Sequence, residues 1–272
     1  MKNLNIYILG AGKPKYGLWN SSLRAVTKTK RVLDWQLEEL SGIEANIVFI
    51  AGYQLENVAK KFPNLIFKFN PKWAESGPVF SLLKSDINDK STNIYSYGDI
   101  VYRKAIIKKL IKSDSDISIA IDKGWETRYK KRSENDLLRS EKVIVKNFQV
   151  KQIGTNIPIN QDTSEFAGII CLKSKASKFI KSNFKEFENE FADSSLPEFL
   201  TYLMASGLTI EAIDIEGKWA ELNSSNDLIQ FIFGTKAETL KELSKILKLS
   251  KIKKQYFFNI NEWNKNKNQI LK

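Results

Sequence analysis

The chain has 272 residues and a formal net charge of +12, with 42% hydrophobic and 27% charged residues, which is ordinary for a globular protein with a sizeable core. It contains no histidine and one cysteine, Cys171, which excludes Ser-His-Asp and Cys-His catalysis, histidine zinc sites and internal disulfides. Any catalysis must therefore use carboxylates, lysines, arginines, backbone amides or a hard cation held by oxygen ligands.

Composition also bears on location and partners. No apolar run approaches the ~18 residues of a membrane span, and the N-terminus lacks a signal-peptide core, so we expect a cytoplasmic protein with no membrane partner. Lysines greatly outnumber arginines and are spread along the whole chain, which favours a solvated surface over nucleic-acid binding. We expect small anionic substrates and no nucleic acid.

The first half of the chain alternates apolar runs with amphipathic segments. Strands are predicted at 4–9, 46–51, 65–69, 93–97 and 117–121, and helices at 31–40, 55–61, 80–85 and 104–112. This βαβα alternation predicts an α/β fold, with a Rossmann-like, mostly parallel sheet and helices on both faces.

The pattern changes after residue 122. Residues 123–139 are highly charged and predict a loop or short helix over the site, and 141–153 and 165–172 predict a small, hairpin-rich β insertion. Further elements are predicted in chain order as helices at 174–191 and 197–206, a strand at 208–215, a helix at 226–233 and a lysine-rich C-terminal helical tail.

The first strand opens directly into the glycine loop Gly10-Ala11-Gly12-Lys13. Glycines let backbone N–H groups approach a polyphosphate closely, and lysine adds positive charge. The loop matches neither GxGxxG nor a P-loop, so a plain strand-to-helix turn is the alternative.

Ligands of open α/β sheets lie beyond the carboxyl ends of the strands. Three segments are expected to converge there: the glycine loop, Gly98-Asp99 after a strand, and Glu221-Leu222-Asn223. Asp99 and Glu221 could hold one Mg²⁺ that bridges a triphosphate. The alternatives are a turn or helix-cap role for Asp99 and a surface position for Glu221.

Over roughly residues 4–232 the ordered motifs resemble the nucleotidyltransferase family that activates sugar phosphates and phospho-alcohols, including bacterial cytidylyltransferases of the phosphocholine and phosphoglutamine type. The motifs that carry the resemblance are Ile8–Gly12, Val32–Leu37, Ser96–Asp99, Ile119–Asp122, Glu141–Val143, Glu165–Gly168 and Trp219–Ser224.

The resemblance implies Mg²⁺-dependent transfer of NMP, with CTP as the expected donor of CMP, to a small phosphorylated acceptor with release of pyrophosphate. It implies catalytic roles for Lys13, Asp99 and Glu221, and metal ligation by Asp99, Glu221 and Asn223. Arg24 is a further catalytic candidate, because it is close enough in the chain to compensate for a lysine that the family usually carries. The nucleotide-binding positions implied are Leu9, Gly10, Ala11, Gly12, Lys13, Gly77 and Gly98.

Three positions depart from the family pattern. Asn223 stands where a second acid is usual, lysines stand where the first loop usually has an arginine, and Asn20-Ser21 replaces a proline-lysine pair. These departures keep a non-catalytic nucleotide-binding or scaffold domain as the alternative. A glycosyltransferase is disfavoured, because Gly98-Asp99-Ile100-Val101 lacks the Asp-x-Asp metal motif expected at that strand end.

Acceptor binding is expected from the charged segment after residue 122. Arginine forks suit a phosphate, and an aromatic pair beside a carboxylate suits a quaternary amine. The alternative is a solvated lid. The candidate acceptor-binding residues are Asp122, Trp125, Arg128, Tyr129, Arg132 and Glu165.

The tail at 233–272 resembles the opening of the ATP-binding region of phosphoenolpyruvate-synthase-like kinases. This resemblance implies a possible kinase partner and a role in decorating capsule or other cell-surface polysaccharide. A C-terminal helix that packs on the core is the alternative.

Overall fold

The computed structural model describes residues 3–14, 17–129 and 134–222, and scattered positions from 227 to 267. The chain divides into two compact units, Met1–Asn223 and Ser224–Lys272. The helix predicted at 226–233 and the tail fall largely outside the described residues, so a domain boundary near residue 232 stays a prediction. In the part of the chain described, no helix is both long and apolar enough to cross a membrane.

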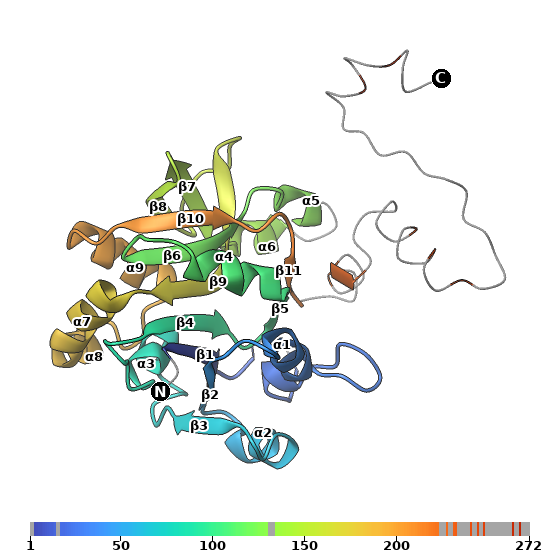
Figure 1. The fold of residues 1–272 in the computed structure, drawn as a ribbon, viewed down its shortest axis with the longest axis vertical. Coiled ribbons are helices and arrows are strands. Elements are labelled where there is room, and N and C mark those ends of the chain that lie inside the picture. Colours follow the sequence, from blue (N-terminus) through green and yellow to red (C-terminus); the bar gives the residue numbers. More distant parts are fainter. Residues whose placement is uncertain are drawn as a thin grey trace. The chain divides into compact units, whose positions relative to one another are not determined.

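The first unit is built around a nine-stranded sheet with strand order β3-β2-β1-β4-β9-β6-β10-β8-β7 (Figure 1). Strands β3, β2, β1 and β4 run parallel, as do β6 and β10, which confirms the predicted α/β architecture. These strands are β1 Leu4–Gly10, β2 Asn46–Ala51, β3 Ile66–Phe69, β4 Thr92–Tyr97, β6 Ile117–Asp122, β7 Lys142–Lys146, β8 Gln149–Gly154, β9 Thr163–Leu172 and β10 Ile210–Asp214.

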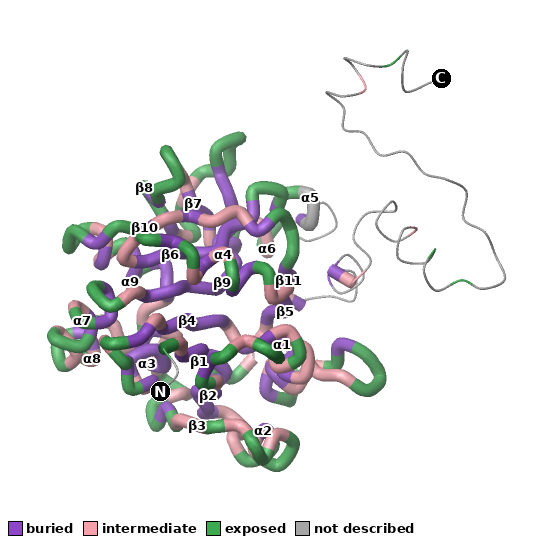
Figure 2. The backbone as a smooth tube through the Cα atoms, in the orientation of Figure 1, coloured by how far each residue is buried: buried purple, intermediate pink, exposed green. Residues whose placement is uncertain are grey.

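Helices cover both faces of this sheet, and the alternation along β1 shows why. Tyr7 and Leu9 point into one core with α3, α7, α8 and α9, whereas Ile6 and Ile8 point into the other with α1, α2 and α4. The middle strands of the sheet are therefore mostly buried (Figure 2). The helices are η1 Ser21–Leu23, α1 Val32–Leu40, α2 Leu55–Lys61, α3 Pro78–Leu83, α4 Lys104–Ile111, α5 Glu126–Tyr129, α6 Glu134–Arg139, α7 Ser174–Ser182, α8 Phe184–Glu190 and α9 Leu196–Ala205.

Two elements differ from the sequence-based expectation. Strand β9 pairs with β7 of the hairpin, as expected, but it also runs through the middle of the sheet, antiparallel to both β4 and β6, and is buried along its whole length. The single helix predicted at 174–191 is two helices, because the backbone of Asn183 leaves helical geometry between α7 and α8. Neither difference changes the predicted fold class.

A second, two-stranded antiparallel sheet pairs β5 (Ile100–Tyr102) with β11 (Trp219–Glu221). Its register places Glu221 opposite Ile100. Strand β5 follows β4 after the two-residue turn Gly98-Asp99, so this small sheet brings Asp99 and Glu221 to the same end of β4.

A ladder of three asparagine amides, two of them buried, fixes the other end of the parallel strands. Asn5 of β1 pairs in register with Asn46 of β2 and with Asn93 of β4. Asn46 Nδ2 donates to Asn5 Oδ1 at 2.9 Å, and Asn5 Nδ2 donates to Asn93 Oδ1 at 3.1 Å. Asn93 Nδ2 in turn lies 2.9 Å from Ser177 Oγ. A one-residue slip of any strand would break this ladder, so it specifies the register.

We expect the substitution Asn93→Ala to lower the free energy of unfolding by about 2–4 kcal/mol, because it leaves several buried polar groups without partners. Urea denaturation of the variant and the parent protein measures the difference. A change below roughly 0.5 kcal/mol would contradict the structural role given to the ladder.

Candidate active site

The turn Gly98-Asp99 lies directly against the glycine loop. The Gly98 N–H donates to Leu9 O at 2.9 Å. A Cβ at Gly98 would lie 2.9 Å from both Gly10 Cα and Ser22 Oγ, so a larger residue would push the turn away from the loop. The predicted meeting of these two segments is therefore present, and it depends on glycine at position 98.

The glycine loop divides into a packed part and an accessible part. A Cβ at Gly10 would lie 2.1 Å from the Phe49 ring, so Gly10 is required by packing. Ala11 is buried, and its carbonyl accepts a hydrogen bond from Tyr53 N at 2.8 Å. Gly12 and Lys13 are exposed, and a Cβ at Gly12 would meet nothing within 4 Å. The accessible part is therefore Gly12-Lys13.

Asn20 binds the segment that follows the glycine loop to the loop itself. In the sequence comparison it stands where the family usually has its proline-lysine pair. Its Nδ2 donates to Gly10 O at 2.8 Å and to Tyr53 O at 2.9 Å. Its backbone N–H donates to Gln54 Oε1 at 2.9 Å. The departure at Asn20 thus has a local structural role, because the side chain ties the loop to the ends of β1 and β2.

Arg24 contacts the segment that carries one predicted metal ligand and lies near enough to the other to affect its charge. Its guanidinium donates to Leu222 O, next to Glu221 in the chain. Burial raises the pKa of Asp99, and the positive charge of Arg24 partly opposes that rise. The structure therefore brings Arg24 close to Asp99 and to the segment that carries Glu221, and the catalytic roles of these three residues stay predictions.

Glu141 is a third acid at this place, and the sequence analysis did not assign it a role. Tyr97 Oη donates to its carboxylate oxygens at 3.2 and 3.3 Å. Burial, with the negative charges of Glu221, Glu165 and Asp99, raises the pKa of Glu141 from its ordinary value of 4.5 to about 8. The only sequence feature that could have indicated a role for Glu141 is its position immediately before the strand that begins at Lys142.

Among the described acceptor candidates, Trp125, Tyr129 and Glu165 form a connected group beside these acids. The Trp125 indole is fully buried and donates to Thr163 O at 2.9 Å, and its ring contacts Tyr129 edge to face. Tyr129 Oη donates to the Glu165 carboxylate. Trp125 therefore supports Tyr129 from behind and presents no exposed face of its own.

Asp122 and Glu165 are both buried and lie opposite each other in the register of β6 and β9. Asp122 accepts hydrogen bonds from Gly124 N at 2.8 Å and from the Trp219 indole at 3.3 Å, so it joins the charged segment to β11. Its contacts here are structural, and its role in acceptor binding stays a prediction.

Lys142 supplies a buried cation that the sequence analysis did not single out. Its register partner in β9 is Glu165, and its Nζ donates to Ser140 O at 2.9 Å and to Thr155 O at 2.6 Å. Burial lowers the pKa of Lys142, and the charge of Glu165 opposes that shift. Lys142 thus balances part of the acidic charge around Glu165.

Of the remaining predicted site residues, Gly77 is described by the structure and the side chains of three others are not. Gly77 is the N-cap residue of α3, and its N–H donates to Ala192 O at 2.8 Å. A Cβ there would lie 2.3 Å from Ser194 O, which gives this glycine a packing reason independent of any ligand. Three predicted positions lie outside what the structure describes: the Arg128 side chain, Arg132 and Asn223.

The carboxylates of Asp99 and Glu221 suit a hard cation, but they supply only two of its ligands. Within the described residues, no three histidine, cysteine or acidic side chains form a ready metal-ligand group. Two carboxylates are nonetheless what Mg²⁺ commonly takes from a protein when phosphates and water complete its coordination shell. A divalent cation would also offset the negative charges of Glu221, Glu165 and Asp99, which together with burial raise the pKa of Glu141.

We expect Glu141→Gln to stabilise the metal-free protein at pH 8. Because folding raises the pKa of Glu141, the folded state holds this proton more tightly than the unfolded chain, and stability falls as pH rises from about 4.5 to about 8. The glutamine keeps an acceptor for Tyr97 without the charge. Urea unfolding in EDTA should show a gain on the order of 1–3 kcal/mol at pH 8 and little gain at pH 5. Equal effects at both pH values would contradict this assignment.

Comparison with known proteins agrees with this geometry. No protein-family model matches the chain. A CTP:phosphoglutamine cytidylyltransferase from Campylobacter jejuni is 26% identical over 224 residues, which cover 74% of this chain and 87% of that protein.

Solved structures share the fold at lower sequence identity. The inositol-1-phosphate CTP transferase of T. maritima matches 91% of this chain and 98% of its own, with a TM-score of 0.58 and 18% identity. The CTP:phosphocholine cytidylyltransferase of Streptococcus pneumoniae matches 90% of this chain and 100% of its own, with a TM-score of 0.57 and 18% identity. Together these findings support the nucleotidyltransferase family for this chain, as its sequence motifs indicate.

Proposed function

We propose that the protein is a Mg²⁺-dependent cytidylyltransferase that transfers CMP from CTP to a small phosphorylated acceptor and releases pyrophosphate. The observation that carries the proposal is the convergence of three distant segments at one edge of the sheet. The glycine loop, the Gly98-Asp99 turn and Glu221 meet there through the Gly98–Leu9 hydrogen bond and the pairing of β5 with β11.

The chemistry suits a protein without histidine. An oxygen of the acceptor phosphate attacks the α-phosphorus of CTP, the bond from that phosphorus to the β-phosphate bridging oxygen breaks, and pyrophosphate leaves with the bonding electrons. The attacking phosphate is already ionised, so no general base is needed, and the protein supplies position and charge.

Residues of this chain would divide that work. The accessible amides of Gly12-Lys13 and the Lys13 ammonium group would bind the triphosphate, and Arg24 would place positive charge beside it. Asp99 and Glu221, with Asn223, would hold Mg²⁺, which when bound neutralises charge on the phosphates.

The acceptor proposed for this site carries a cationic organic group besides its phosphate. Glu141 and Glu165 add two carboxyl groups beyond the two acids assigned to the metal, and a bound cation would favour the charged form of Glu141; Tyr129 donates a hydrogen bond to Glu165. Carboxylates beside an aromatic ring suit an ammonium group. The names of two matched proteins, which specify phosphoglutamine and phosphocholine, agree with this class. Phosphate binding by Arg128 and Arg132, a kinase partner and a role in capsule decoration stay predictions.

The proposal predicts pyrophosphate release from CTP and Mg²⁺ with at least one acceptor in a panel of phosphocholine, phosphoethanolamine, phosphoglutamine, inositol 1-phosphate and sugar 1-phosphates. We expect Asp99→Ala to lower kcat/KM by about 10³-fold or more, because it removes a metal ligand from the reacting phosphates. Asp114→Ala is the matched control, since Asp114 is an exposed acid after α4. Circular dichroism checks that each variant is folded.

Full activity of Asp99→Ala would overturn the metal assignment. Calorimetric binding of CTP without turnover on any acceptor would favour the alternative of a non-catalytic nucleotide-binding or scaffold domain. A panel with CTP replaced by ATP, GTP or UTP determines whether cytidine is the preferred base.

A further inference from the structure

Helix α1 holds both sides of the turn that carries Asp99. Gln36, in the middle of this helix, is fully buried. Its Nε2 donates to Tyr97 O at 2.9 Å and to Ile100 O at 2.8 Å. These carbonyls belong to the residues immediately before and after Gly98-Asp99, so one amide group bridges the turn.

The amide oxygen of Gln36 indicates why a glutamine stands at this position. Its Oε1 is buried and has no hydrogen-bond partner among the described residues. A buried acceptor without a partner costs free energy, which an apolar side chain of the same size would avoid. Packing alone therefore does not account for glutamine at this position, whereas the two N–H groups directed at the turn do.

Further hydrogen bonds hold Gly98, the first residue of the turn. The Gly98 N–H binds Leu9 O, and the Gly98 carbonyl accepts a hydrogen bond from Ser22 Oγ at 2.9 Å. Asp99 is the second residue of this turn, so the backbone of the turn carries its carboxylate. Rotation of the turn would therefore rotate the carboxylate.

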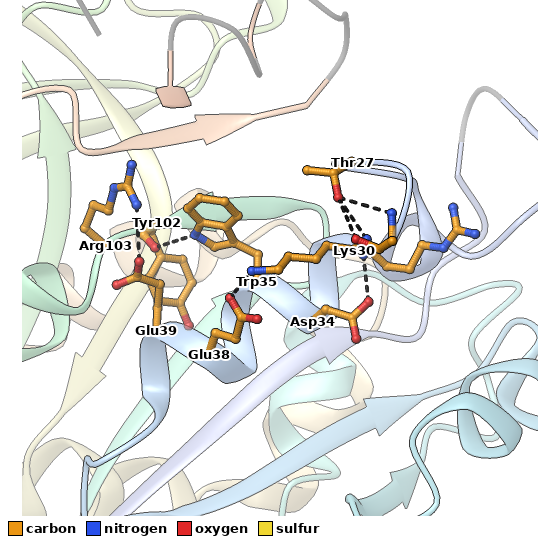
Figure 3. Close-up of polar contacts among 10 residues, drawn as sticks. Thr27, Lys30, Asp34, Trp35, Glu38, Glu39, Tyr102 and Arg103 are labelled. Carbon is orange, nitrogen blue, oxygen red and sulfur yellow. Dashed lines mark hydrogen bonds and ion pairs between the residues drawn. The ribbon is translucent and has the colours of Figure 1, made fainter. Parts of the chain in front are cut away.

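Helix α1 also binds the chain beyond the turn, as Figure 3 shows. Trp35 Nε1 donates to Tyr102 O at 3.3 Å, and Glu39 accepts a hydrogen bond from Lys104 N at 2.7 Å. The Arg103 guanidinium lies 5.0 Å from the Trp35 ring centre and pairs with Glu39. The helix thus fixes the whole course of β5, the strand that also pairs with Glu221.

We propose that Gln36 is a positioning residue for the metal site: its amide sets the turn so that the Asp99 carboxylate faces Glu221. The inference rests on the proposed function, because Asp99 must be a metal ligand for this orientation to matter. Gln36 itself touches neither the metal nor the substrate. Outer-shell groups that orient metal ligands change metal affinity by about 10–100-fold when they are lost.

The test measures Mn²⁺ binding by the decrease of the free-ion EPR signal, with CTP present at saturation and no acceptor added. We expect Gln36→Met, which keeps the side-chain length and removes both donors, to raise the Mn²⁺ dissociation constant about 10-fold or more. Gln36→Glu, measured at pH 6, keeps the shape and can offer one O–H donor, so its affinity should lie between those of the parent protein and Gln36→Met. This second variant also serves if Gln36→Met does not fold.

Asn93→Ala is the matched control, since it removes a buried amide from the opposite end of β4. We expect it to lower the melting temperature and leave the Mn²⁺ dissociation constant unchanged. If the Gln36 variants also lose stability without losing Mn²⁺ affinity, the positioning role is overturned while the proposed function stands. If the parent protein binds no Mn²⁺ with CTP, the proposed function fails, and this inference fails with it.

Discussion

The contact between Gly98 and Gly10 is the constraint on which the rest of the site depends. Parallel strands β1 and β4 are neighbours, and each ends at the same edge of the sheet. Their following segments can approach this closely only because position 98 carries no side chain. The first acid therefore lies beside the glycine loop, and β5 extends from there to pair with the strand that carries the second acid.

Around this contact the protein concentrates negative charge that it only partly neutralises. Burial and the charges of Glu221, Glu165 and Asp99 raise the pKa of Glu141, while Arg24 lies near Asp99 and Lys142 near Glu165 as opposing positive charges. Tyr97 lies among these acids. Its hydroxyl donates to Glu141, and burial together with the charges of Glu141, Asp99 and Glu221 raises the pKa of Tyr97. Such a cluster is costly to a metal-free fold and useful to a protein that binds cations.

Much of this arrangement follows from the sequence, because it depends on local pattern. Strands β1 and β2 and helix α2 appear close to where apolar periodicity places them, and the rule that ligands lie at the carboxyl ends of strands predicts that Asp99 meets the glycine loop. The central position of β9 could not be predicted in this way. A continuous apolar run identifies a buried strand without naming its neighbours.

The side chains that hold the site were also beyond sequence reasoning. Asn20 and Gln36 bind backbone carbonyls of residues far away in the chain, and no local signal marks such a pairing. The raised pKa of Glu141 depends on burial and on acids from distant parts of the chain, which no local pattern reveals. Trp125 carried an aromatic signal for ligand binding, yet its burial depends on β9 and α5 folding over it.

The central claim is that Asp99 and Glu221 hold one divalent ion facing the glycine loop. A crystal of the protein grown with CTP and Mn²⁺ tests it most directly through the anomalous scattering of manganese. The account predicts a peak between the two carboxylates, with the triphosphate against the amides of Gly12 and Lys13. A manganese peak elsewhere, or a triphosphate bound away from that loop, would contradict it.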